Sequence, residues 1–372
     1  MTTLPAPPST RTPAPAPDTT RSHVSLTSGR LPGWTPWVLL GACLAVAGAV
    51  FGLLAAAGGT EFSLAGWLVT SAIVYLVLIY ALSRIVEGAR RAFDRFVTGL
   101  VSVAFAIAMV PLVSVAITVI TTGLARFDAE FFSYSMRGVL GEGGGALHAI
   151  TGTLLITLAA AVISIPIGLM TAVYLVEYGQ ESRLAKAITF LVDVMTGIPS
   201  IVAGLFAYAL FALIFGPGVR MGFAGAVALS VLMIPVVVRS SEEMLRLVPN
   251  ELREAAFALG VPKWLTIVKV VLPTSIAGIT TGVMLSIARV IGETAPLLIT
   301  AGFTDAMNYN LFDGRMQTLP VYIYSQYAYK GIPAEAYVDR AWAAALTLIL
   351  IVMVLNLVAR LVAKLFAPKT GH

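Results

Sequence analysis

The chain has 372 residues and a formal charge of +5; 58% of its residues are hydrophobic and only 12% are charged. Soluble domains are about 45–50% apolar and about 25% charged, so the composition argues strongly against an ordinary soluble enzyme. The single cysteine excludes a disulfide framework and a cysteine-based metal centre. The three histidines lie far apart in the sequence, which disfavours a histidine-centred catalytic site.

Residues 1–33 are rich in Pro, Thr, Ser and Ala. Such a composition cannot bury enough apolar surface to build a core, so we predict a disordered tail. The apolar run that begins at Trp34 is too long for the hydrophobic region of a signal peptide. We therefore interpret it as the first membrane span.

Eight apolar stretches follow the tail, and each is long enough to cross a hydrocarbon layer of about 30 Å as a helix. In lipid every backbone polar group must be satisfied internally, which favours helices. The stretches are Trp34–Ala57, Leu64–Val86, Phe96–Leu124, Ile150–Val176, Ile188–Phe215, Gly222–Val238, Ser275–Ala301 and Ala341–Ala359. The sequence thus predicts an all-α polytopic transmembrane helical bundle.

The basic residues predict the orientation of the bundle. If the N-terminus is cytoplasmic, 17 of the 24 Lys and Arg residues lie in cytoplasmic segments, six lie on the opposite face, and Arg289 lies within a span. This asymmetry follows the positive-inside rule. The basic character therefore records membrane topology, because no clustered basic face with interleaved aromatic residues suggests a nucleic-acid footprint.

The cytoplasmic loop at residues 239–274 is long enough to fold. It predicts a short helix up to Val248, a second helix over Glu251–Leu259 with an apolar stripe, and a left-handed stop at Gly260. Pro262 can start a third helix, because proline is tolerated at the first helical position. The resulting elbow suits a groove on a partner protein, or equally an interfacial helix on the bilayer.

A family resemblance adds to this interpretation. Glu254-Ala255-Ala256, then Gly260, then Leu272-Pro273 at fixed spacing resemble the EAA motif of bacterial ABC-importer permeases, with Val270 in place of the usual Ile. The resemblance implies that these residues couple the chain to an ATPase. The chain has no phosphate-loop motif, so ATP and Mg are expected to bind to a partner, with no cofactor in this chain.

Arg289 and Glu293 are charged residues within the seventh apolar stretch. Four residues apart on a continuous helix, their side chains would share one face and could pair. Ionisable groups inside membranes usually line a substrate or ion path, although a charge pair that locks two helices is the alternative. Asp193 gives a weaker signal, since an interhelical hydrogen bond explains it equally well.

Three segments resemble the phosphate permeases of the PstA family: Ala288–Leu298, Ile234–Glu243 and Thr318–Tyr324. The resemblance assigns the substrate path to Arg239, Arg289, Glu293 and Thr294. The planar guanidinium fork of Arg289 matches phosphate oxygens. Arg239 is equally explained as a basic residue at the cytoplasmic end of a span that only helps to set the membrane orientation.

We therefore expect a disordered cytoplasmic tail (residues 1–33), an extra two-span hairpin (34–95) and a six-span permease core (96–372). The implied function is the permease subunit of an ATP-driven phosphate importer in the bacterial plasma membrane. The implied partners are a second permease (PstC), two copies of the ATPase PstB, the phosphate-binding protein PstS and membrane lipid. The alternatives are an ion-coupled secondary carrier for an anion and an ABC permease for another oxyanion.

Overall fold

The computed structural model describes residues 31–58, 63–179 and 182–366, and every regular element within these ranges is helical. Most of the predicted tail, residues 1–30, lies outside the described residues. The chain divides into two compact units, Met1–Val113 and Ser114–His372. This division falls inside helix α3 (Ala89–Gly123), whereas the sequence places the start of the permease core at residue 96.

The first unit contains α1 (Thr35–Gly58), α2 (Leu64–Val86) and the start of α3. The turn between α2 and α3 is fixed by Glu87, whose side chain is 1% exposed and accepts a 2.6 Å hydrogen bond from Arg95 Nε. Ser83 Oγ and the Leu31 N–H also donate to this carboxylate. Burial alone would raise the pKa of Glu87, but these hydrogen bonds lower it to about 2.

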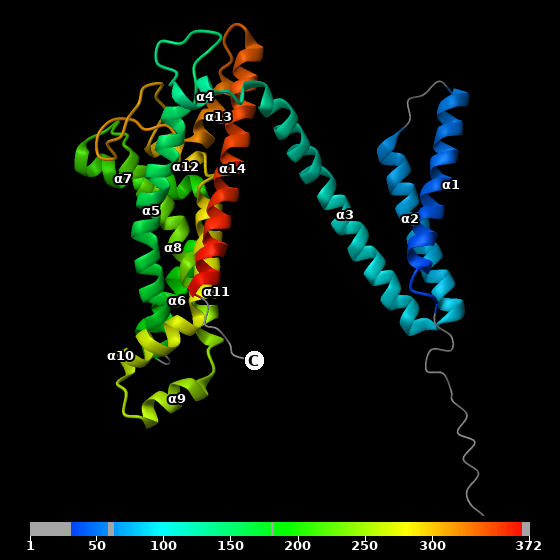
Figure 1. Ribbon diagram of the computed structural model, residues 1–372, viewed down its shortest axis with the longest axis horizontal. Coiled ribbons are helices and arrows are strands. Elements are labelled where there is room, and N and C mark those ends of the chain that lie inside the picture. The colour runs from blue at the N-terminus through cyan, green and yellow to red at the C-terminus, as the bar shows by residue number, and fades with distance from the viewer. Residues whose placement is uncertain (1–30, 59–62, 180–181, 367–372) are drawn as a thin grey trace, which may run out of the picture. The chain divides into compact units, whose positions relative to one another are not determined.

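The second unit is a helical bundle built around α8 (Gly222–Arg246), which packs against α5 (Leu147–Val173) and α11 (Leu272–Val290) (Figure 1). Helix α14 (Ala334–Phe366) packs against α11. Small residues allow these helices to approach closely, as is usual in membranes. A Cβ built at Gly282 of α11 would lie 2.4 Å from Ser240 Oγ of α8.

The fifth predicted span, Ile188–Phe215, is broken into two helices. Helix α6 (Arg183–Thr196) and helix α7 (Ser200–Phe215) meet at 109°. Pro199 lies at the break; it has no N–H to donate and disfavours helical geometry in the residue before it. Seven described helices are long and apolar enough to span a membrane, or eight if this bent pair is one span.

The seventh predicted span is broken as well. Helix α11 ends at Val290, and the short helix α12 (Ala295–Thr300) begins after a four-residue interruption, with Pro296 at its second position. At its other end α11 continues α10 (Lys263–Thr266) and the π-helical turn η3 (Ile267–Val271). The third helix predicted for the loop therefore merges with the span.

The remaining elements lie at the two ends of this bundle (Figure 1). One end carries α9 (Asn250–Ala258) and α10, and we call it the coupling end. The opposite end carries α4 (Ala129–Ser133) and α13 (Leu319–Ala328). Two short turns complete the fold: η1 (Leu124–Arg126) precedes α4, and the π-helical η2 (Tyr174–Tyr178) extends α5.

Candidate functional site: a broken-helix path and a coupling elbow

The two broken helices pack against each other. A Cβ built at Gly204 of α7 would lie 2.6 Å from the Cα of Pro296 in α12, so only glycine allows this approach. On its other side α12 packs on α8, where a Cβ at Gly225 would lie 3.0 Å from Leu297 Cδ2. Interrupted helices at membrane depth are tolerated where they are buried in protein or line a cavity, and they often mark transport sites. The breaks therefore define the candidate path.

Arg289, Glu293 and Thr294 lie at the break between α11 and α12. Arg289 is exposed in the last turn of α11, Glu293 is half-buried beyond the helix end, and Thr294 immediately precedes α12. Because the helix ends at Val290, the expectation that Arg289 and Glu293 share one helix face is wrong. No ion pair joins these two residues. Both charged groups remain available to a ligand or a partner chain.

Arg239 lies on α8 and is engaged by two carboxylates. Its Nη1 donates to Glu242 Oε2 at 2.8 Å, and its Nη2 forms an ion pair with Asp193 of α6. Arg246 shares the buried Glu242, at 2.6 Å. The interhelical role considered for Asp193 is thus confirmed. A topology signal alone does not require this pairing, so Arg239 also ties the broken helix to the centre of the bundle.

The second helix of the elbow and its stop form as the spacing predicts, whereas the first predicted helix is the end of α8. Helix α9 stops where Gly260 adopts φ +75°, with its N–H donating to Phe257 O at 2.9 Å. The Val261 N–H donates to Ala256 O at 3.1 Å, which completes a Schellman motif. The predicted left-handed conformation of Gly260 is therefore confirmed. Within the EAA motif, Glu254 and Ala255 are exposed whereas Ala256 is buried.

Leu272 and Pro273 occupy the first two positions of α11, directly after the π-helical turn η3. Leu272 is half-buried and Pro273 is exposed. Proline is tolerated there because the first helical N–H groups have no partner within an isolated helix. The two residues therefore mark the joint between the elbow and the span, and they belong to the same continuous helical run from Lys263 to Val290.

A buried ion pair that the sequence does not reveal anchors this elbow. Arg253 of α9 donates to Glu177 Oε1 of η2 at 2.8 Å from Nη2, and the two side chains are 13% and 6% exposed. The same guanidinium donates to Val248 O at 2.6 Å and to Leu245 O at 2.9 Å. Arg253 therefore holds α9 against the ends of α5 and α8. The sequence hints at this pair only through an acid directly after an apolar stretch.

The surface around this anchor combines a cavity with exposed apolar side chains. The cavity, of about 260 Å³, is lined by residues that include Glu177, Arg253 and Lys263. Leu259 and Trp264 project from the elbow, 83% and 60% exposed. Exposed apolar surface beside polar groups is typical of a protein interaction site.

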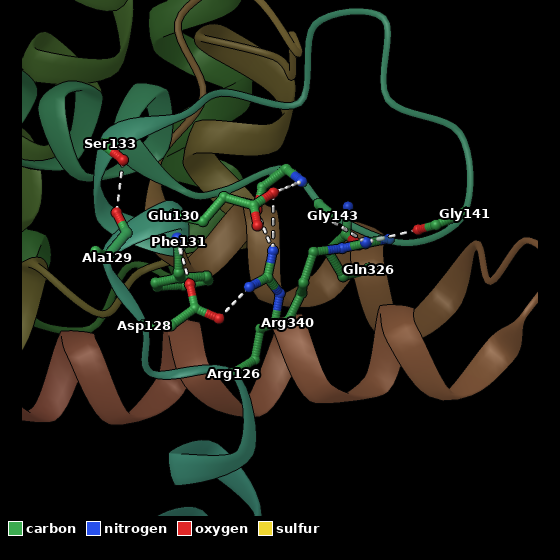
Figure 2. A network of polar contacts seen from close by, with 11 residues as sticks. Arg126, Asp128, Ala129, Glu130, Phe131, Ser133, Gly141, Gly143, Gln326 and Arg340 are labelled. Atoms are coloured by element: carbon green, nitrogen blue, oxygen red, sulfur yellow. Dashed lines mark hydrogen bonds and ion pairs between the residues drawn. The ribbon is translucent and has the colours of Figure 1, made fainter.

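At the opposite end, two arginines hold the loop of residues 141–145, which we call the glycine-rich loop, as Figure 2 shows. Arg340 is fully buried and donates from Nη1 to Gly141 O at 2.7 Å and to Gly143 O at 3.0 Å. Arg126 forms an ion pair with Glu130, which accepts the Gly144 N–H at 2.9 Å. Neither arginine is close to the loop along the chain, so sequence patterns alone do not reveal these contacts.

The fold and this site define a transmembrane subunit of a transport system, with a path through broken helices and an elbow for a partner. Residues 164–372 match the family described as "Binding-protein-dependent transport system inner membrane component". The chain belongs to this family, so it is a multi-pass inner membrane permease component that works with an ATPase and a binding protein, and not itself the enzyme.

Within this family the chain belongs to the PstA branch. It is 48% identical over 276 residues to "Phosphate transport system permease protein PstA 1" of Mycobacterium tuberculosis strain H37Rv, covering 73% of this chain and 88% of that protein. PstA of Pasteurella multocida is 43% identical over 66% of this chain and 85% of its own. A solved structure of the inward-facing methionine ABC transporter MetNI matches with TM-score 0.47 and 20% identity over 60% of this chain and 95% of its own.

Proposed function

We propose that the chain is the permease subunit of an ATP-driven importer of inorganic phosphate. The observation that carries the proposal is Arg289, which is exposed at the break between α11 and α12 and pairs with no acid among the described residues. The chain that carries it is 48% identical to a phosphate transport permease. A guanidinium stays charged at any physiological pH and presents a planar fork that binds two phosphate oxygens.

The substrate path then runs past the break, with Arg289 binding the anion and Thr294 donating a hydroxyl hydrogen bond. Glu293 repels a fully ionised anion, yet it can accept the proton of hydrogen phosphate, which sulfate lacks. Arg239, shared between Asp193 and Glu242, lies nearer the coupling end and would meet the anion as it leaves. Because its two carboxylate partners neutralise its charge, Arg239 binds phosphate only weakly and lets the anion leave.

Transport follows alternating access. ATP binding and Mg binding belong to a partner ATPase, which docks on the elbow through Glu254, Ala255 and the exposed apolar residues. The Schellman stop at Gly260 fixes the shape of this elbow, and the Arg253–Glu177 pair transmits its displacement to α5 and α8. Leu272 and Pro273 pass the same displacement to α11, at whose far end Arg289 lies.

The partners in this proposal are a second permease of the PstC type, two copies of a PstB ATPase and a PstS phosphate-binding protein. The coupling end then faces the cytoplasm, together with the N-terminus, and the opposite end receives the binding protein. The excess of Lys and Arg on the coupling side supports this orientation.

Uptake in proteoliposomes tests the proposal. The chain is co-expressed with its second permease and ATPase, and phosphate uptake is measured with loaded binding protein outside, with and without ATP inside. We expect uptake that requires ATP and that excess sulfate does not inhibit. ATP-independent uptake driven by an ion gradient would instead identify a secondary carrier, and inhibition by another oxyanion would identify a different substrate.

A further inference from the structure

Two arginines from separate segments flank Gly302 at the end of α12. A Cβ built at Gly302 would lie 3.0 Å from Arg220 Cδ and 3.4 Å from Arg315 Cδ, so the two Cδ atoms are no more than about 6.4 Å apart. Arg220 lies in the connection between α7 and α8, and Arg315 lies in the loop before α13. Residues 95 positions apart in the chain therefore place their cationic side chains around one glycine.

The backbone builds this arrangement. Directly after Arg220, the Met221 N–H donates to Thr300 O at 3.1 Å; directly after Arg315, the Met316 N–H donates to Ala301 O at 3.1 Å. The two arginine-bearing segments are thus hydrogen-bonded to consecutive residues of one short stretch. Gly302 follows that stretch at φ +74°, a conformation that favours glycine. Its missing side chain leaves room for both arginine stems.

Neither guanidinium has an acidic partner in the part of the chain that the structure describes. Asp305 and Asp313, the two acids of the loop that carries Arg315, form no ion pair with either arginine. Like charges on neighbouring side chains repel each other, and an anion bound between them relieves that repulsion. Arg220 is half-buried and Arg315 is exposed, so both side chains remain accessible.

This geometry points to an oxyanion. Two guanidinium forks can each present parallel N–H donors to one tetrahedral anion, which is the arrangement that arginine makes with phosphate. The pair also lies close to the candidate path. Helix α12, which is six residues and about 9 Å long, connects the pair to Glu293 and Arg289.

We propose that Arg220 and Arg315 form a receiving site for inorganic phosphate at the opposite end of the bundle, where the anion binds before it reaches Arg289. The proposal rests on the proposed function and adds a site to it. The anion then passes from two unpaired arginines to Arg289 and leaves past the neutralised Arg239, so the positive charge available to it falls along the path.

Binding of inorganic phosphate tests the site. The assembled complex, without binding protein and in lipid nanodiscs, carries Arg289→Gln so that the receiving site is measured alone. Line broadening of the phosphate ³¹P resonance reports binding. We expect Arg220→Gln with Arg315→Gln to weaken binding at least about tenfold. The control Arg137→Gln, an exposed arginine of the same end, should leave binding unchanged.

Two results would overturn the site. One is equal phosphate binding with and without the two arginines in correctly assembled complex. The other is unchanged phosphate binding combined with lost capture of the loaded binding protein, which would make the pair a docking contact for protein carboxylates. Phosphate uptake by the unmutated complex tests the proposed function separately, so a failed receiving site and a failed importer give different results.

Discussion

Arginine is used differently at the two ends of the bundle. At the coupling end, Arg253 and Arg239 are bound to carboxylates of other helices, at Glu177 and Asp193. At the opposite end, Arg126 pairs with acids of its own segment and Arg340 is buried against backbone carbonyls. Arg220 and Arg315 there have no acidic partner among the described residues. A joint that transmits force needs fixed, neutralised connections, whereas a surface that receives an anion needs uncompensated positive charge. The difference therefore follows the direction of transport proposed above.

Breaking the paired arginine of the elbow should have the largest effect. Arg253→Met leaves Glu177 buried without its partner, which should cost about 3–5 kcal/mol of stability and abolish substrate-stimulated ATPase activity. Replacing both residues, Arg253→Met with Glu177→Leu, removes the unpaired charge and should restore most of the stability but not the coupling. Thermal unfolding and ATPase assays of the purified complex measure both. Full coupling in the double variant would show that the pair transmits no force.

The buried Arg340 should be less costly to remove, because its partners are neutral. Arg340→Gln leaves the Gly141 and Gly143 carbonyls with fewer donors but creates no unpaired charge, so we expect a loss of about 1–3 kcal/mol. Protease sensitivity of the glycine-rich loop and thermal unfolding check this. A loss as large as that of Arg253→Met would remove the distinction between the two ends.

The shape of the elbow depends on one glycine. Gly260→Val forces a β-branched residue into the left-handed region, at about 1–2 kcal/mol locally. We expect normal membrane insertion and lost ATPase coupling. Gly52→Ala is the matched control, because a Cβ there meets open space within α1. Normal ATP coupling in the Gly260 variant would contradict docking at the elbow.

The smallest effect concerns Glu87, the acid that pairs with Arg95 in the first unit. Glu87 has a pKa of about 2 against a usual 4.5. Its folded pKa is depressed, so its contribution to stability is complete above about pH 4.5 and is lost as the pH falls toward 2. The stability difference between the unmutated protein and Glu87→Gln should therefore shrink from pH 7 to pH 3, as thermal unfolding would reveal. An unchanged difference would mean that Arg95 does not stabilise the charged form.

Sequence patterns predicted the spans and the elbow because both depend on local chemistry. Apolar length marks the helices, and Gly260 can be recognised as a stop from its place after an amphipathic stretch. The two helix breaks were missed, since Pro199 and Pro296 are equally compatible with a kinked but continuous span. The Arg253–Glu177 and Arg220–Arg315 pairs could not be predicted, because each joins segments distant in the chain whose proximity depends on packing.

The most direct test of the account is phosphate uptake by the double variant Arg289→Ala with Glu293→Ala in a transporter-null strain, normalised to membrane-inserted complex. Because no ion pair links these residues, removing both leaves no orphan partner that could explain a defect. The account predicts normal assembly with little or no uptake, and partial recovery of uptake when Arg289→Lys replaces Arg289→Ala. Near-normal uptake by the double variant would contradict a substrate role for Arg289.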